Sequence, residues 1–270
     1  MGFLFSLLLG LMGVGIGAYG TLIGVGGGVI LVPLLLYLYP QELPRTITSI
    51  SFAVVFLNAL SGTIAYKRMR RIDYRTGLIF SVATIPGVIL GVLANSFLSR
   101  NLFQLVFGIM LTAMAIYIFL RPKSTPVRLF RAYEGTKRHI VDYTGLAYEY
   151  SFDLRLGVVL SFAVGFIAGI LGIGGGVIHV PLLISLLGFP PHVATATSHF
   201  ILVITALFGT LTHMAAGDLN DGWKQTLILG AGVIIGAQIG AKFSSRVGGT
   251  TIVRLLALAL LFLGIRLLWP

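Results

Sequence analysis

The chain has 270 residues, of which 57% are apolar and only 10% charged, and its formal net charge is +11. It contains no cysteine, so disulfides, thiolate metal ligands and cysteine nucleophiles are excluded. Uncharged runs of about 20 residues are typical of a polytopic membrane protein. The basic residues gather in loops and at segment ends, as in membrane proteins, so the positive charge does not indicate nucleic-acid binding.

The first apolar run, 2–38, is interrupted at 24–28 by the sequence Gly-Val-Gly-Gly-Gly. The run is too long for one membrane crossing and too short for two crossings with a loop. Consecutive glycines disfavour a plain helix, and Pro33 suits the first turn of a half-helix that begins after them. We therefore expect a re-entrant hairpin that turns at the glycines, with a single kinked span as the alternative.

Three further apolar runs follow and complete a first transmembrane repeat over residues 1–120; they are 46–66, 76–98 and 102–120. The loop 67–75 carries five lysine or arginine residues, which marks it as cytoplasmic. Residues 121–153 form the only long polar segment. We expect a cytoplasmic linker there, because so short a polar segment cannot build a hydrophobic core of its own.

Residues 154–270 form a second transmembrane repeat that shows the same landmarks in the same order. A repeat this long indicates a duplicated half rather than a solenoid unit. The sequence therefore predicts an all-α polytopic membrane protein of two homologous halves, each with four apolar segments. Hairpins at both breaks would make the halves inverted repeats, whereas kinked spans would make them parallel. The matched landmarks are the breaks 24–28 and 172–176, the pairs Thr48-Ser49 and Thr197-Ser198, and the pairs Gly87, Gly91 and Gly232, Gly236.

All eight acidic residues lie in loops or at segment ends. A carboxylate proton relay, an acidic cation filter and an aspartyl intramembrane protease each need acidic side chains inside the membrane, so all three are disfavoured. Half-helices that begin at Gly28 and Gly176 would direct backbone N–H groups into the protein, and helix starts of this kind bind anions. The pattern favours an anionic or neutral substrate; tight helix packing at the glycines is the alternative.

The two glycine–proline breaks, 24–33 and 172–181, each followed by a Thr-Ser pair, resemble the sulfite exporter TauE/SafE family over essentially the whole chain. The resemblance implies a multi-pass carrier of the prokaryotic inner membrane that moves small anions, sulfur-containing ones such as sulfite and sulfonates or carboxylates. It also implies that the substrate site includes Gly26, Gly27, Gly28, Thr48, Ser49, Gly174, Gly175, Gly176, Thr197 and Ser198. Thr48 and Ser49 lie only about one helical turn inside their run, so capping or packing is the alternative for them.

Three histidines, His179, His199 and His213, lie in membrane segments of the second half only. Histidine titrates near neutral pH, so each is a candidate for proton coupling. His199, beside Ser198, is also a candidate substrate ligand. A neutral histidine bonded to a helix carbonyl is the alternative for each. A metal site is disfavoured because no carboxylate or thiolate accompanies the three in the membrane, and we expect no cofactor.

These features together predict a secondary carrier, not an enzyme, whose substrate binds between the two breaks and is exposed to each side in turn. Its expected partners are a small anion and the lipid bilayer, with no nucleic acid. An anion channel and a membrane-embedded histidine-based metal enzyme are the alternatives. The enzyme is the weaker of the two, because Ser198 and His199 are adjacent and do not face each other on a helix.

Overall fold

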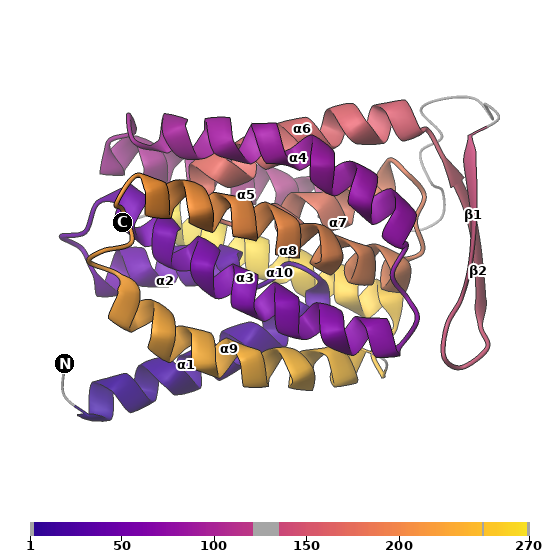
Figure 1. Cartoon of the computed structure of the whole chain (residues 1–270), viewed down its shortest axis with the longest axis horizontal. Coiled ribbons are helices and arrows are strands. Elements are labelled where there is room, and N and C mark those ends of the chain that lie inside the picture. The colour runs from indigo at the N-terminus through magenta and orange to yellow at the C-terminus, as the bar shows by residue number, and fades with distance from the viewer. Residues whose placement is uncertain (1–2, 121–134, 245, 269–270) are drawn as a thin grey trace.

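The computed structural model describes residues 3–120, 135–244 and 246–268, and helices dominate it (Figure 1). The helices of the first half are α1 (Phe3–Ile23), α2 (Gly28–Leu38), α3 (Pro44–Arg68), α4 (Tyr74–Asn95) and α5 (Arg100–Leu120). Those of the second half are α6 (Leu154–Leu171), α7 (Gly176–Ser185), α8 (Pro191–Ala215), α9 (Trp223–Ser244) and α10 (Gly249–Leu268). Within the described ranges, eight helices are long and apolar enough to cross a membrane, while α2 and α7 are shorter. The predicted all-α polytopic membrane protein is confirmed.

The two halves interleave and do not form separate bundles. Helix α1 packs along α9, and α4 packs along α6, so each of these pairs joins one half to the other. The two pairs are equivalent in the two halves, because α1 corresponds to α6 and α9 corresponds to α4. Helices α3 and α8 pack against each other and are the most buried spans, whereas α5 and α10 pair with each other and are the most exposed. The substrate site was expected in this buried centre.

Glycines let the interleaved helices touch backbone to backbone. A Cβ added at Gly91 of α4 would overlap a carbonyl oxygen of α6, and one at Gly240 of α9 would overlap the equivalent oxygen of α1. Gly87 and Gly236 repeat this relationship one turn earlier in their helices. The structural counterparts are therefore Gly87 with Gly236 and Gly91 with Gly240. The sequence match to Gly232 and Gly236 was one helical turn out of register.

The chain turns back on itself at each glycine break. After the second break, a Cβ on Gly175 would lie 3.2 Å from Val164 of α6, and further along α7 the Nε2 atom of His179 lies 3.4 Å from the Oγ atom of Ser161. As α7 advances, it meets earlier residues of α6. Gly27 likewise lies against Ile16, well before the end of α1. These are the contacts of a hairpin and not of one continuous kinked helix.

The expected linker contains a β-hairpin that the sequence did not predict; its first part, 121–134, lies outside the described residues. Strands β1 (Thr136–Val141) and β2 (Ala147–Phe152) pair antiparallel. The aromatic rings of Tyr150 and Phe152 are buried and pack against Phe189, which follows α7. Figure 1 shows the hairpin at one end of the molecule, opposite the chain termini. The hairpin thus obtains its apolar contacts from the helical body.

Candidate functional site

Both glycine breaks have the same backbone conformation. The φ angles are 82°, 76° and 84° at Gly24, Gly26 and Gly27, and 72°, 71° and 94° at Gly172, Gly174 and Gly175. Positive φ is accessible to glycine at little cost and strained for other residues. The turn itself therefore requires glycine at three positions of each break, and the fourth glycine begins the half-helix.

The two breaks meet in the interior of the molecule. A Cβ on Gly28, which begins α2, would lie 2.9 Å from the Cα atom of Ile173 in the second break. A Cβ on Gly176, which begins α7, would lie 2.9 Å from the Cα atom of Val25 in the first break. Every helix start leaves backbone N–H groups without partners inside the helix. Two such starts therefore lie side by side where the halves join.

Two apolar side chains fill the space between the breaks: Val55 from α3 and Leu202 from α8. Both are fully buried. A Cβ on Gly26 would lie 3.2 Å from an atom of each, and a Cβ on Gly174 would lie 2.8 Å from Val55 and 2.6 Å from Leu202. Counted along the chain, Val55 and Leu202 lie the same number of residues after the proline that begins their helix, Pro44 in α3 and Pro191 in α8. A surface hollow of about 710 Å³ lies between the end of α3, the start of α4 and α8, and one of about 260 Å³ lies at the end of α9. Between the breaks, the Val55 and Leu202 side chains close the centre in this conformation.

Of the predicted pair in the first half, only Thr48 reaches a glycine break. A Cβ on Gly172 would lie 2.6 Å from the Thr48 Cβ, and the Thr48 hydroxyl lies 3.3 Å from the Nε2 atom of His213. The Ser49 hydroxyl instead lies 3.1 Å from the carbonyl oxygen of Asp218 in the turn after α8. Both side chains are fully buried. Ser49 therefore holds a turn, whereas Thr48 supports the second break.

The predicted pair in the second half is divided in the same way. Ser198 donates a hydrogen bond of 3.1 Å to the carbonyl oxygen of Gly24 in the first break. Thr197 accepts one of 3.0 Å from the backbone N–H of Asp73, which lies just before α4. The threonine at the break is Thr195, whose Cγ2 would lie 2.7 Å from a Cβ on Gly24. Thr197 thus joins α8 to the start of α4.

These contacts set a register that differs from the sequence match by two residues. Ser51 donates a 2.6 Å hydrogen bond to the carbonyl oxygen of Gly172, as Ser198 does to the first break. The structural counterparts are therefore Thr48 with Thr195 and Ser51 with Ser198. Ser51 and Thr195 were missed. The signal that could have found them is the spacing Pro-x-x-x-Thr-x-x-Ser, which opens both α3 and α8.

The candidate residue His199 lies beside the first break. Its Nε2 atom lies 3.2 Å from the Thr21 hydroxyl, which donates a 3.1 Å hydrogen bond to the Asn58 side-chain oxygen. Because Thr21 has one hydroxyl proton, Nε2 of His199 is the donor to it. The Asn58 amide nitrogen is buried and has no hydrogen-bond partner among the described residues. Such a group costs free energy until a ligand or water satisfies it.

The other two candidate histidines, His179 and His213, have different surroundings from His199. His179 of α7 faces Ser161 of α6, as described above. His213, at the end of α8, lies between Thr48 and Asp218, with its Nδ1 atom 2.8 Å from the Asp218 carboxylate. Over the described residues, no group of three or more histidine, aspartate or glutamate side chains is placed to hold a metal ion.

Comparison with known proteins places this architecture in a family. The sequence profile of the sulfite exporter TauE/SafE family matches residues 9–267. The chain belongs to the TauE/SafE sulfite exporter family. Probable membrane transporter protein YunE of Bacillus subtilis is 34% identical over 275 residues, which cover 100% of this chain and 98% of that relative. No solved structure gives a significant match.

Two further relatives match at lower identity. A probable membrane transporter protein of Methanocaldococcus jannaschii is 24% identical over 253 residues, 89% of this chain and 86% of that protein. Sulfite exporter TauE/SafE family protein 6 of Arabidopsis thaliana is 32% identical over 96 residues, 36% of this chain and 22% of that protein. The resemblance found in the sequence is confirmed, and the chain is a multi-pass protein of a membrane transporter family.

Proposed function

We propose that this TauE/SafE protein is a secondary carrier for small anions, which bind where the two glycine breaks meet. The observation that carries the proposal is the pair of half-helices that begin side by side at Gly28 and Gly176. Their free N–H groups and positive dipole ends attract anions without a buried cation. Sulfite, sulfonates and small carboxylates are the expected substrates, in line with the family's name.

The transport step we propose is alternating access between inverted halves. The hairpin contacts at both breaks and the exchange of the α1–α9 pair with the α4–α6 pair support this arrangement. The loop 67–75 and the β-hairpin would then lie in the cytoplasm and the termini outside. For an anion to reach the breaks, Val55 and Leu202 must move apart. A centre filled by these side chains favours a gated carrier over an open anion channel.

Reconstitution in liposomes tests the proposal. Purified protein should catalyse saturable uptake of radiolabelled sulfite or methanesulfonate, and unlabelled anion inside the vesicle should accelerate uptake of labelled anion. That acceleration is expected of a carrier and not of a channel. Unsaturable conductive flux would indicate the channel, and no flux of sulfite, methanesulfonate or acetate would defeat the proposed function.

A further inference from the structure

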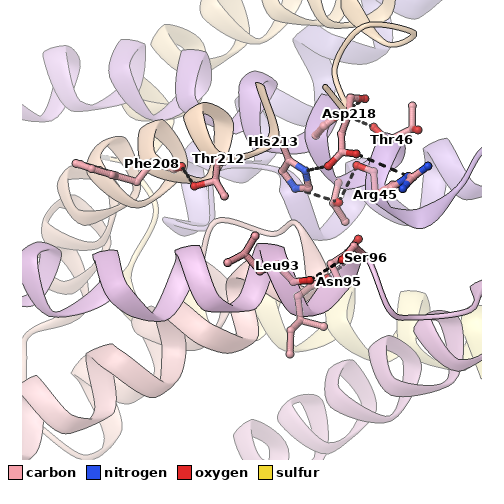
Figure 2. Close-up of polar contacts among 12 residues, drawn as sticks. Arg45, Thr46, Leu93, Asn95, Ser96, Phe208, Thr212, His213 and Asp218 are labelled. Carbon is pink, nitrogen blue, oxygen red and sulfur yellow. Dashed lines mark hydrogen bonds and ion pairs between the residues drawn. The ribbon is translucent and has the colours of Figure 1, made fainter. Parts of the chain in front are cut away.

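A buried histidine–carboxylate pair stands at the end of α8, where the chain turns toward α9 (Figure 2). The Nδ1 atom of His213 lies 2.8 Å from an Asp218 carboxylate oxygen, and the backbone N–H of Asp218 donates a 3.0 Å bond to the carbonyl oxygen of His213. The side chain of His213 is 1% exposed and that of Asp218 is 11% exposed. Asp218 is therefore the solvent contact of the pair, and His213 is its inner member.

On the side opposite Asp218, His213 contacts the Thr48 hydroxyl, which can change its hydrogen-bond partner. The Thr48 oxygen lies 3.3 Å from Nε2 of His213 and 3.1 Å from the carbonyl oxygen of Arg45. A carboxylate only accepts hydrogen bonds, so Nδ1 carries a proton in both states. When His213 is neutral, Thr48 donates to Nε2. When His213 is protonated, Nε2 donates to Thr48, whose own proton turns to the Arg45 carbonyl. Each protonation state thus has a complete set of hydrogen bonds.

The Thr48 side chain connects this switch to the transport site, because it packs against Gly172 of the second break. Among the described residues, few charged groups contact the pair. Asp218 bonds His213 directly, and Arg45 lies 3.7 Å from the far oxygen of Asp218. The Phe52 ring, 5.8 Å from the histidine ring between centroids, closes another side. The Asp218 carboxylate is thus the charge nearest the histidine ring, and the Arg45 guanidinium lies behind it.

The equivalent position in the first half cannot do the same. There the pseudo-symmetric contact is between His199 and Tyr66, with ring centroids 5.5 Å apart. The Tyr66 hydroxyl donates a 2.7 Å hydrogen bond to the carbonyl oxygen of Thr21. A phenol has an ordinary pKa of about 10, so it does not gain and lose a proton near neutral pH. The histidine–carboxylate pair is therefore a property of one half.

We propose that His213 is a proton-binding site that couples anion transport to protons, with Asp218 as the carboxylate that accepts its Nδ1 hydrogen bond and Thr48 as its link to the second break. The proposal rests on the proposed anion transport. When one proton binds Nε2, the charge of the pair changes from −1 to zero. Loss of that negative charge beside the break favours an anion there, so proton and anion stabilise each other's binding. One proton then moves with each anion.

The test uses proteoliposomes that enclose a pH-sensitive dye, with methanesulfonate as the probe. Methanesulfonate stays ionised at neutral pH, so protons that cross with it are carried by the protein. The wild type should move protons with the anion. His213→Gln and Thr48→Val should each lower the ratio of protons to anions by about tenfold or more, the range of a strong coupling. Thr48→Ser keeps the hydroxyl and should restore the ratio.

His139→Gln is the matched control, because His139 is also paired with a carboxylate but lies on strand β1, outside the membrane-spanning helices, with its side chain 58% exposed. It should leave the ratio unchanged. Exchange of labelled for unlabelled methanesulfonate at equal pH needs no net proton movement, so it verifies that His213→Gln is folded. In detergent, methanesulfonate added over a range of pH should cause proton uptake by the wild type and not by His213→Gln.

Two results separate the two claims. Saturable methanesulfonate flux without proton movement, or an unchanged proton-to-anion ratio in His213→Gln, would overturn the role of His213 and leave the anion carrier in place. Absence of flux for sulfite, methanesulfonate and acetate alike would defeat the carrier itself, on which the coupling rests.

Discussion

Val55 and Leu202 lie in one buried cluster, one from each half of the chain, and together they fill the space between the two glycine breaks. Equivalent residues of a duplicated fold thus close the place where two half-helices begin. The closure explains why the proposed anion site is lined here by aliphatic carbon. It also means that substrate access requires the centre to open.

Cysteine labelling follows this opening directly. The natural chain has no cysteine, so the wild type serves as the unlabelled control. Val55→Cys and Leu202→Cys should react slowly with a membrane-impermeant thiol reagent in the closed state. Sulfite or methanesulfonate should change the labelling rate of both variants, since the centre must open during transport. Labelling that is fast and indifferent to every anion would show that the pair is not a gate.

Leucine at the turn glycines should abolish transport. Gly175 has φ of 94°, and a left-handed conformation costs other residues about 1–2 kcal/mol before any steric clash. In Gly175→Leu the side chain would also meet Val164 and Ala168 of α6, next to the start of α7. Methanesulfonate uptake by the purified variant measures the effect.

Gly188→Ala is the control for backbone strain alone. Gly188 has φ of 70°, but the nearest atom to an added Cβ is 3.9 Å away. It should lose about 1 kcal/mol of stability and keep its transport. Equal loss of transport in Gly188→Ala and Gly175→Leu would mean that strain, and not the site, accounts for the defect.

Alanine at the helix crossings should destabilise both halves alike. Gly91→Ala and Gly240→Ala each place a methyl group on a facing carbonyl oxygen, and such overpacking costs about 1–3 kcal/mol. Gly15→Ala is the matched control, because nothing lies within 4 Å of its Cβ and alanine favours the helix. The thermal unfolding midpoint in detergent should fall in the first two and not in the third. A fall in only one of the two crossings would contradict the pseudo-symmetric register.

The β-hairpin should loosen at low pH through Asp142. Burial raises the pKa of this carboxyl, but hydrogen bonds from Thr144, Arg71 and the Leu146 backbone outweigh it and hold the pKa below its ordinary value. The interaction therefore stabilises the fold above the unfolded pKa of about 3.9 and is lost as pH falls toward the folded value.

Asp142→Asn tests this dependence at a buried ion pair, since Arg71 and Asp142 lie 3.0 Å apart with side chains 6% and 0% exposed. Removing one partner of such a pair costs about 3–5 kcal/mol. Protease cleavage of the hairpin should increase in the variant at pH about 7, and the wild type should approach the variant as the pH falls through and below the unfolded pKa of about 3.9. A difference that persists undiminished at the lower pH would exclude this linkage.

The sequence predicted what depends on repetition and hydropathy. The doubled glycine stretch located both turns, and apolar length located the spanning helices. Register was harder, because 46–51 and 195–198 are both rich in threonine and serine, so neighbouring alignments match almost equally well. Only the contacts of Thr48 with Gly172 and Thr195 with Gly24 decide between them.

Other features give no local signal. Val55 and Leu202 are ordinary apolar residues in apolar helices, and only the fold places them between the breaks. Asp218 stands in a polar turn, which the sequence places outside the membrane, and its pairing with His213 depends on how α8 ends. The β-hairpin was missed because its apolar partners, such as Phe189, belong to another segment.

Anion exchange in proteoliposomes tests the central claim most directly. Vesicles loaded with unlabelled methanesulfonate or sulfite are diluted into the labelled anion, with wild type and Gly175→Leu compared at equal protein content. We predict saturable accumulation of label that depends on internal anion in the wild type and is absent in the variant. Equal exchange by Gly175→Leu would contradict a substrate site at the glycine breaks.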